Sequence, residues 1–229
     1  MKAAFYFDLA SPLAYLAAER VLHELPLAAE WQPVLARELG AHVPGAHAQR
    51  EHGEHAARER ERATRGQIER AARELGLQQV RWPEPFPFDS ELAMRVATYA
   101  KQIGRAVAFA QAAFRQSYAG GRCLQESDSV LIAAAACEMH PAAVLRAAQM
   151  SSVAAQLARS TERAALVGVR AVPAIALDAG VLDAGADAGA DAGAGEQLVF
   201  DGARALDDAL DALAGARGSS RTTRLTRSA

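Results

Sequence analysis

The chain opens with a short run of apolar residues, 3–8, that contains three aromatic side chains. A run this short and this uniformly apolar is typical of a strand that is buried on both faces. Ser11 and Pro12 follow directly, and these residue types are preferred at the N-cap and at the first position of a helix. Apolar residues then recur at helical spacing as far as Leu25, and a second strand is predicted over 29–34. The first 35 residues are therefore predicted to form a β-α-β unit with a right-handed crossover.

The middle of the chain is predicted to be a helical block. The segment 37–65 is polar, without a clear pattern, and is predicted to be a loop or a mobile helical stretch. Three prolines make 82–88 irregular. Apolar residues spaced three and four apart from 96 to 114 predict one long amphipathic helix. Further helices are predicted over 64–75, 127–140 and 141–167.

The end of the chain returns to strands, predicted over 173–178 and 197–201, and a last helix is predicted over 203–213. The order β-α-β, helical insertion, β-β-α predicts an α/β chain with a thioredoxin-like fold and a large all-helical insertion. The thioredoxin-like domain would comprise residues 1–36 and 165–214, and the insertion 37–164. Repeats of Asp-Ala-Gly at 179–196 predict a hairpin extension, and 215–229 is predicted to be a disordered tail.

The composition agrees with a helix-rich chain. Of 229 residues 51% are hydrophobic, but 56 residues are alanine, the best helix former. The 25 basic and 27 acidic residues give a net charge of −2, which disfavours nucleic-acid binding. No stretch of 18 consecutive apolar residues occurs, so no membrane span is predicted. The N-terminus has no signal-peptide pattern, and we therefore expect a cytoplasmic protein.

The residues that commonly hold metals do not predict a metal site here. Cys123 and Cys137 lie in stretches of helical character without a second ligand pair nearby and are expected to be buried thiols. The histidines of the polar segment share no ordered core that would fix them around an ion. They are His42, His47, His52 and His55.

The first predicted helix offers a place for a thiolate. The N–H groups of its first turn and the helix dipole favour negative charge beside the Ser11 hydroxyl. Redox proteins of this fold carry a Cys-x-x-Cys pair here, whereas residues 11–14 read Ser-Pro-Leu-Ala. A thiolate at this position must therefore arrive with a ligand, unless Ser11 is only a helix cap. Pro173 opens a returning strand and is expected to be cis, with the backbone of Val172 available to an extended peptide.

Four segments in order resemble a known family. Residues 5–16, Phe-Tyr-Phe-Asp-Leu-Ala-Ser-Pro-Leu-Ala-Tyr-Leu, are similar to the opening of 2-hydroxychromene-2-carboxylate isomerases, which are relatives of kappa-class glutathione transferases. Segments 86–95, 109–121 and 161–173 match later parts of the same pattern, so the resemblance covers residues 3–213.

The resemblance implies a glutathione-dependent isomerase that acts on a conjugated aromatic carbonyl acid. Ser11 would stabilise the glutathione thiolate, and the enzyme would form a homodimer. Residues implied for glutathione are Val172, Pro173, Arg60 and Asp201. Residues expected to line the substrate pocket are Pro12, Trp82, Phe88 and Asp89.

The chain departs from the family pattern at several positions: an asparagine expected near residue 42 is missing, Ala171 stands where glycine is usual, and two further departures bear on ligand binding. Asp89 stands where asparagine is usual, and its carboxylate would repel an acidic substrate. Arg204 stands where an acid usually binds the ammonium group of glutathione. Two alternatives therefore stay open, a kappa-like glutathione transferase and a non-redox binding protein of the same fold that has lost glutathione binding.

Overall fold

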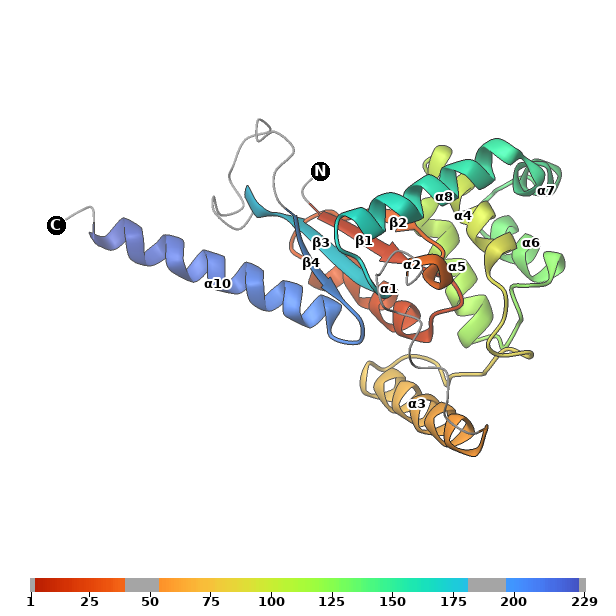
Figure 1. The fold of residues 1–229 in the computed structure, drawn as a ribbon, viewed down its shortest axis with the longest axis horizontal. Helices are drawn as coiled ribbons and strands as arrows, with labels where there is room; N and C mark the ends of the chain where they lie inside the picture. Colours follow the sequence, from red (N-terminus) through yellow and green to blue (C-terminus); the bar gives the residue numbers. More distant parts are fainter. Residues whose placement is uncertain (1–2, 40–53, 181–196, 227–229) are drawn as a thin grey trace.

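The computed structural model describes residues 3–39, 54–180 and 197–226, and side chains for 3–39, 64–180 and 197–216. Its elements are β1 (Ala3–Phe7), α1 (Pro12–Glu24), β2 (Glu30–Pro33), α2 (Ala36–Leu39), α3 (Glu54–Glu74), α4 (Glu91–Gln102), α5 (Ala106–Tyr118), α6 (Ser127–Ala135), α7 (Pro141–Gln149), α8 (Ser151–Leu166), β3 (Ala174–Asp178), β4 (Gln197–Asp201) and α10 (Ala205–Thr226). Figure 1 shows the sheet between α1 and α8, with α4–α7 gathered at one side.

Within the described residues the strands form one four-stranded sheet in the order β2-β1-β3-β4. β1 pairs with β2 in parallel and with β3 antiparallel, and β3 pairs antiparallel with β4. This arrangement agrees with the predicted β-α-β and β-β-α units, because the crossover helix α1 joins the parallel pair and β3 leads into β4 and α10.

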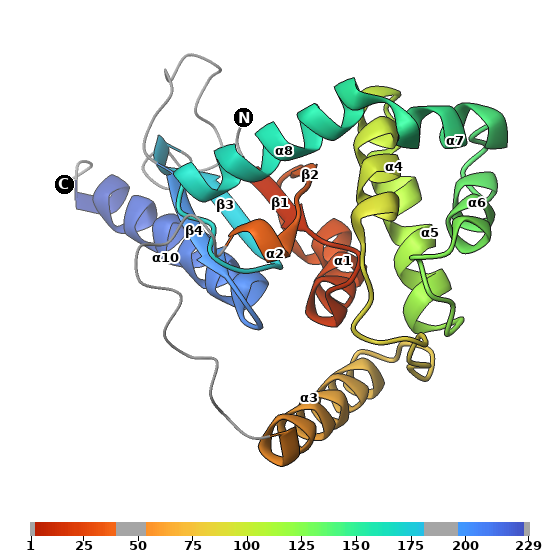
Figure 2. The same ribbon diagram turned by 45° about the vertical axis from the view of Figure 1, so that its right-hand side comes forward.

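The central strand β1 is buried on both faces, as its apolar run predicts. Phe5 and Phe7 pack into the core that includes α1 and the helical block, whereas Ala4 and Tyr6 pack with residues of α8. Side chains alternate along a strand, so consecutive residues reach opposite faces. The two faces of β1 therefore join the layers on either side of the sheet (Figure 2).

The predicted single helix over 96–114 is wrong, because the chain forms two helices there. α4 ends at Gln102, and α5 begins at Ala106. Gly104 between them has φ +72°, a left-handed conformation that breaks the helix and that glycine adopts without strain. The apolar spacing continues through the break because both helices bury residues in the same core.

Two helices are longer than predicted. α3 begins at Glu54, within the segment predicted to be a loop or a mobile helical stretch, and so starts before the predicted helix over 64–75. α10 continues to Thr226, past its predicted end at Leu213 and through most of the tail predicted to be disordered. No proline follows Ala205 in the sequence to stop this helix. The extension predicted at 179–196 lies outside the described residues from position 181 onward.

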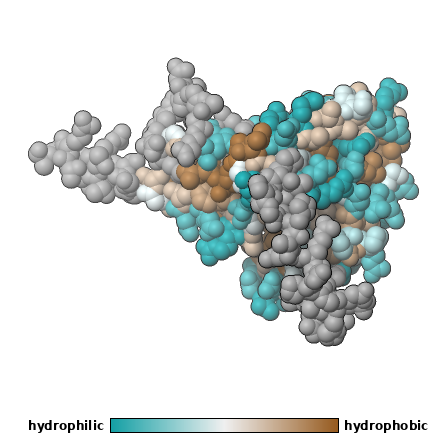
Figure 3. Space-filling view, viewed as in Figure 1, coloured by the Kyte–Doolittle hydropathy of each residue, from teal (hydrophilic) through white to brown (hydrophobic). Residues whose placement is uncertain are grey.

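Buried apolar residues of the helical block form part of the main core. In the view of Figure 3 the block presents a largely hydrophilic face with small hydrophobic patches. In the described part of the chain, no helix combines the length and the apolar character that crossing a bilayer requires.

Candidate functional site

The Ser11 hydroxyl lies at the N-terminus of α1 and bridges two distant parts of the chain. Its Oγ accepts a hydrogen bond of 3.1 Å from the N–H of Ala14 and thereby caps the helix. The same hydroxyl donates a long hydrogen bond of 3.4 Å to the carbonyl oxygen of Val172. Ser11 is therefore a helix cap, as its simplest interpretation predicts, and it also touches the segment that precedes Pro173.

The backbone of Val172 is well placed to pair with an extended ligand. The Val172–Pro173 peptide bond is cis, as expected. Among the described residues, the N–H of Val172 has no hydrogen-bond partner, and its carbonyl has only the long bond from Ser11. The Pro173 carbonyl, by contrast, accepts a 2.9 Å hydrogen bond from the N–H of Gly202. Both polar groups of Val172 therefore remain available on the edge of this segment.

The side chain of Asp8 connects the backbone segments that lie around Ser11. It is only 3% exposed, and its Oδ1 accepts the N–H of Ala10 while its Oδ2 accepts the N–H of Ala36, both at 2.9 Å. Burial raises the pKa of Asp8, while hydrogen bonds from Ala10, Ala36 and Ser90 oppose that rise. The carboxyl group thus holds together the loop before α1, the start of α2 and the N-cap of α4.

These groups surround a pocket of about 700 Å³. The residues that line it are Asp8, Ala10, Ser11, Ala36, Arg37, Pro87, Phe88, Asp89, Ser90, Arg170, Ala171 and Val172. They come from the segment between β1 and α1, from α2, from the turn before β3 and from the proline-rich connection to α4. A pocket that places a hydroxyl at a helix N-terminus beside a free peptide edge suits a small peptide-like ligand.

The guanidinium of Arg37 connects α2 to the segment that leads into α4. Arg37 on α2 forms ion pairs with Asp89 and with Glu91, the latter at 2.6 Å. The N–H of Glu91 and the charge of Arg37 hold the pKa of Asp89 below its usual value. Hydrogen bonds from Arg37 and then Arg95 likewise lower the pKa of Glu91. The carboxylate of Asp89, expected from the sequence to repel an acidic substrate, is therefore ionised but paired.

The structure brings some of the predicted site residues together and separates others. Ser11, Val172, Phe88 and Asp89 line the same pocket, and Pro12 and Pro173 adjoin it in the chain without lining it. Asp201 lies behind it, where its Oδ2 accepts the backbone N–H groups of Arg170 and Ala171 at 2.9 and 3.2 Å.

One further predicted residue lies away from the pocket, and the side chain of another falls outside the described residues. Trp82 packs against α3, where its Nε1 donates to Glu69 at 2.8 Å and the Arg65 guanidinium sits 4.9 Å from its ring centre. Arg60 belongs to α3, but its side chain is outside the described part of the chain. Arg204, expected to oppose an ammonium group, pairs instead with Asp208 at 3.0 Å and does not line the pocket.

Three charged residues that line the pocket, Asp8, Arg37 and Arg170, were not predicted from the sequence. Asp8 carries a detectable signal, because it is a charged residue at the end of a buried strand, three positions before Ser11. Arg37 and Arg170 carry none, since arginine is common throughout the chain and only the fold brings these two to the pocket.

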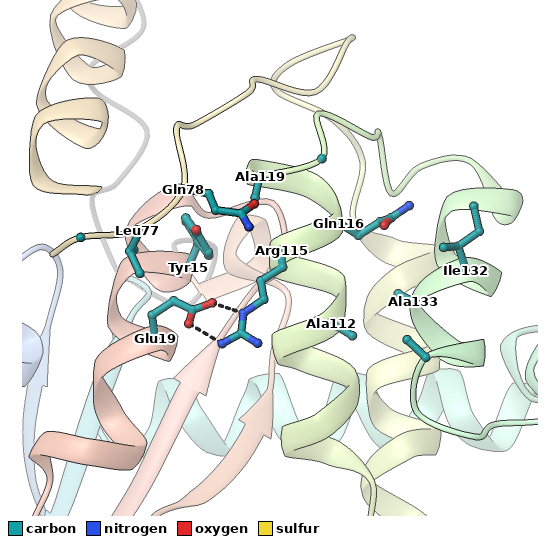
Figure 4. A pocket seen from close by; sticks show the side chains of 13 residues that line it. Tyr15, Glu19, Leu77, Gln78, Ala112, Arg115, Gln116, Ala119, Ile132 and Ala133 are labelled. Carbon is teal, nitrogen blue, oxygen red and sulfur yellow. Dashed lines mark hydrogen bonds and ion pairs between the residues drawn. The ribbon is translucent and has the colours of Figure 1, made fainter. Parts of the chain in front are cut away.

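A second pocket, of about 590 Å³, lies over the outer face of α5, between α1 and α6 (Figure 4). At this pocket Arg115 and Glu19 form a bidentate ion pair, with nitrogen–oxygen distances of 2.7 and 2.6 Å. None of the predicted site residues lines this pocket. The ion pair fastens the helical block to α1.

The two cysteines do not line the pocket around Ser11. Cys123 and Cys137 are free and buried, and burial raises the pKa of Cys137. His42, His47 and His52 fall outside the described residues, as does the side chain of His55. Where the structure describes side chains, no three His, Cys, Asp or Glu residues are grouped to hold a metal ion.

Comparison with known proteins agrees with the predicted fold. A family model described as a DsbA-like thioredoxin domain matches residues 3–214. No curated protein matches. A 2-hydroxychromene-2-carboxylate isomerase superimposes with a TM-score of 0.71 at 16% sequence identity, over 100% of both chains.

Two oxidoreductases have the same fold. A probable DsbA oxidoreductase from Streptomyces coelicolor has a TM-score of 0.68 and 18% identity, covering 95% of this chain and 90% of that one. The cytosolic disulfide reductase DsbM from Pseudomonas aeruginosa, whose structure was solved with GSH, has a TM-score of 0.56 and 16% identity, covering 96% and 100%. Likeness at these identities concerns the fold, and the predicted thioredoxin-like class with its helical insertion is confirmed.

Proposed function

The chain belongs to the DsbA-like thioredoxin domain family, and on this premise we propose that it is a glutathione-dependent isomerase of the 2-hydroxychromene-2-carboxylate type. Its substrate would be a conjugated aromatic carbonyl acid, and it would act in the cytoplasm. Ser11 would stabilise the thiolate of bound glutathione. The homodimer that the resemblance implies is part of the same proposal.

The hydrogen bond between Ser11 and Val172 is the observation that carries this proposal. At 3.4 Å this hydrogen bond is long and weak. It occupies the hydroxyl proton of Ser11 and the carbonyl oxygen of Val172, the two groups with which a bound cysteinyl peptide would pair. A bound glutathione would replace both partners, because its sulfur accepts from the Ser11 hydroxyl and its cysteinyl N–H donates to the Val172 carbonyl. The N–H of Val172 would donate to the cysteinyl carbonyl. The residues present therefore fit this ligand.

Other groups favour the anionic form of the sulfur. The free N–H groups of the first turn of α1 and the dipole of this helix stabilise negative charge near Ser11. When bound, glutathione would supply a thiolate as the nucleophile for reversible addition to the conjugated carbonyl compound, an isomerisation without net oxidation or reduction, while Ser11 and the first turn of α1 would hold that thiolate. Phe88 and Pro87 give the pocket an apolar side suited to an aromatic acid.

Disulfide exchange receives no support from the residues at this position. Residues 11–14 contain no cysteine, and Cys123 and Cys137 are both buried outside the pocket. A thiol at the start of α1 must come from the ligand, which distinguishes this chain from family members that carry their own Cys-x-x-Cys pair.

A kappa-like glutathione transferase is the second candidate, since the same thiolate site would serve it. Chromatographic analysis of products separates the two, because an isomerase returns glutathione unchanged whereas a transferase consumes it in a stable conjugate. A binding protein without glutathione is the third candidate. The argument for this candidate is that Arg204 would repel the ammonium group of glutathione. That argument is weaker in the structure, because Arg204 is paired with Asp208 and does not line the pocket.

The decisive experiment is calorimetric titration with glutathione in two buffers of different ionisation enthalpy, which counts released protons. We expect binding with proton release near neutral pH, and binding without release for S-methylglutathione. Ser11→Ala should reduce the release, whereas Ser11→Thr, which retains the hydroxyl and the helix cap, should preserve it. Ser152→Ala changes an exposed serine on α8 and is the matched control.

Each possible result decides between these hypotheses. If Ser11→Ala releases the same number of protons as the wild type, the role given to Ser11 is wrong. If glutathione does not bind at millimolar concentration, the binding-protein hypothesis replaces the isomerase.

A further inference from the structure

The second pocket, over the outer face of α5, has no part in the proposed function, and its two ends differ in chemistry. Figure 4 shows Tyr15 and Glu19 of α1 at one end and Ile132 of α6 at the other. Ala112 of α5 lies between them, and with Ala133 of α6 it presents only a small side chain to the space of about 590 Å³. A cavity with one polar and one apolar end suits a small amphipathic molecule.

The hydroxyl of Tyr15 is the group at the polar end that a ligand would use. Tyr15 is only 2% exposed, and its ring packs against Phe114 and Tyr118. In the part of the chain whose side chains are described, this hydroxyl has no hydrogen-bond partner, although a buried tyrosine usually has one. Burial and then the charge of Glu19 raise the pKa of Tyr15, so the hydroxyl keeps its proton and can donate it to an acceptor atom.

The two charges at the same end neutralise each other. The side chain of Glu19 is 10% exposed, and its two oxygens accept from Arg115 at 2.7 and 2.6 Å. A ligand ammonium group at this end would meet the charge of Arg115, and a ligand carboxylate would meet that of Glu19. This end therefore favours an uncharged acceptor, such as a carbonyl oxygen.

The other end of the pocket exposes apolar surface. Ile132 is 44% exposed, although it is a large apolar residue, and Ala133 and Ala136 continue the same surface. The amide nitrogen of Gln116 borders it and has no hydrogen-bond partner among the described residues. A flat ring that lay over the alanines would cover Ile132 and remove apolar surface from water, which stabilises the bound state.

We propose that this pocket is a second binding site, for small uncharged aromatic molecules that carry a carbonyl group at one end. The carbonyl oxygen accepts from the Tyr15 hydroxyl, and the ring lies over Ala112 toward Ile132. The site shares α1 with the pocket around Ser11 but none of its lining residues. Binding here requires neither glutathione nor Ser11, so the inference is independent of the proposed function.

The test follows the isoleucine methyl signals by NMR while acetophenone is added without glutathione. The sequence has four isoleucines, Ile68, Ile103, Ile132 and Ile175, and only Ile132 lines this pocket. We expect acetophenone to shift the Ile132 signal saturably, with a dissociation constant of about a millimolar. Ile103 is also 44% exposed but lies outside the pocket, so its signal is the internal control for unspecific binding.

Two substitutions examine the two ends of the ligand. Tyr15→Phe should weaken binding of acetophenone about fivefold, because one hydrogen bond is lost, and should leave binding of toluene, which has no carbonyl, unchanged. Ala112→Leu fills the pocket and should abolish the saturable shift of Ile132. Tyr99→Phe on α4 and Ala154→Leu on α8 make the same changes at partly buried positions outside the pocket and are the matched controls.

Several results would contradict the proposal. Equal shifts of Ile132 and Ile103, or no shift of Ile132, would mean that the pocket is not a binding site. Tighter binding of benzoate than of acetophenone would mean that Arg115 receives an anion and that the ligand class is wrong. Unchanged acetophenone binding by Tyr15→Phe would remove the proposed hydrogen bond. Should Ala112→Leu fail to fold, Ala136→Leu, at an exposed position of the same pocket, provides the block.

Discussion

The Oδ2 atom of Asp8 accepts the N–H of Ala36 at 2.9 Å, and this contact joins the end of β1 to the start of α2 across 28 residues of sequence. The other carboxyl oxygen accepts the N–H of Ala10, one residue before Ser11. A single buried side chain therefore fixes two loops that line the candidate site. It does so with two separate acceptors, which only a carboxyl group supplies at this size.

Replacing this carboxyl group tests its role in stability. Asp8→Asn leaves one backbone N–H without an acceptor and should lower the free energy of unfolding by about 1–3 kcal/mol. Burial raises the pKa of Asp8 above its ordinary value of 3.8, so the protonated acid favours the folded state. The stabilisation from this proton is fully present below the ordinary pKa and is lost as the pH rises through the folded one.

The difference between wild type and Asp8→Asn should therefore be largest in acid and shrink as the pH rises. Urea unfolding at several pH values above the ordinary pKa measures this difference. A difference that grows with pH would mean that the folded protein favours the ionised carboxylate.

A cysteine in place of Ser11 would report directly on the electrostatics of the helix N-terminus. We expect the thiol introduced by Ser11→Cys to have a pKa below about 8.5, the ordinary value for cysteine. The ultraviolet absorbance of the thiolate, followed against pH, gives this pKa. Ser152→Cys provides the comparison because that position is exposed, on α8. Equal pKa values at the two positions would argue against a thiolate site.

The ion pair between Arg37 and Asp89 should govern how well the pocket accepts an anionic ligand. Arg37→Gln leaves Asp89 ionised and unpaired, and we expect glutathione to bind roughly twofold to fivefold more weakly, in keeping with an exposed pair. Adding Asp89→Asn to the same protein should restore most of the affinity. If the double variant binds as weakly as Arg37→Gln, Arg37 contacts the ligand itself.

The turn that leads into α2 depends on a buried hydroxyl. Thr161 on α8 is 1% exposed, and its Oγ1 accepts the N–H of Leu35 and donates to the carbonyl of Leu157, both at 3.0 Å. Thr161→Val preserves the shape but leaves the Leu35 N–H without a partner, and we expect a loss of about 1–3 kcal/mol of stability. Thr161→Ser retains the hydroxyl and should lose less. Urea unfolding of both variants decides the point, and equal losses would assign the effect to packing.

Two glycines with similar backbone angles allow conformation to be separated from contact. Gly104 and Gly121 have φ values of +72° and +71°. An added Cβ meets nothing within 4 Å at Gly104, but lies 3.2 Å from the Cβ of Arg81 at Gly121. Gly104→Ala should cost about 1–2 kcal/mol from backbone strain, and Gly121→Ala should cost more. Thermal unfolding of the two variants gives the comparison, and an equal cost would mean that Arg81 yields freely.

The sequence by itself predicted the strands, the helix start at Ser11 and the insertion between the two halves of the sheet. These features are local, because the apolar run at 3–8, the Ser-Pro pair and the spacing of apolar residues each act within a few turns of chain. The break at Gly104 was missed, since the apolar spacing continued across it and concealed two helices that share one core.

The pocket was decided by the tertiary structure. Ser11 and Val172 are 161 residues apart, and Arg37 meets Asp89 across 52. No local pattern specifies that Asp8 supports two loops, that Arg204 pairs with Asp208, or that Arg170 reaches the pocket wall. Such contacts arise only when β1, β3 and the helical block pack together. The side chains involved are charged or polar. Their roles depend on how deeply packing buries them and on which groups it pairs them with, and the spacing of these residues in the sequence determines neither.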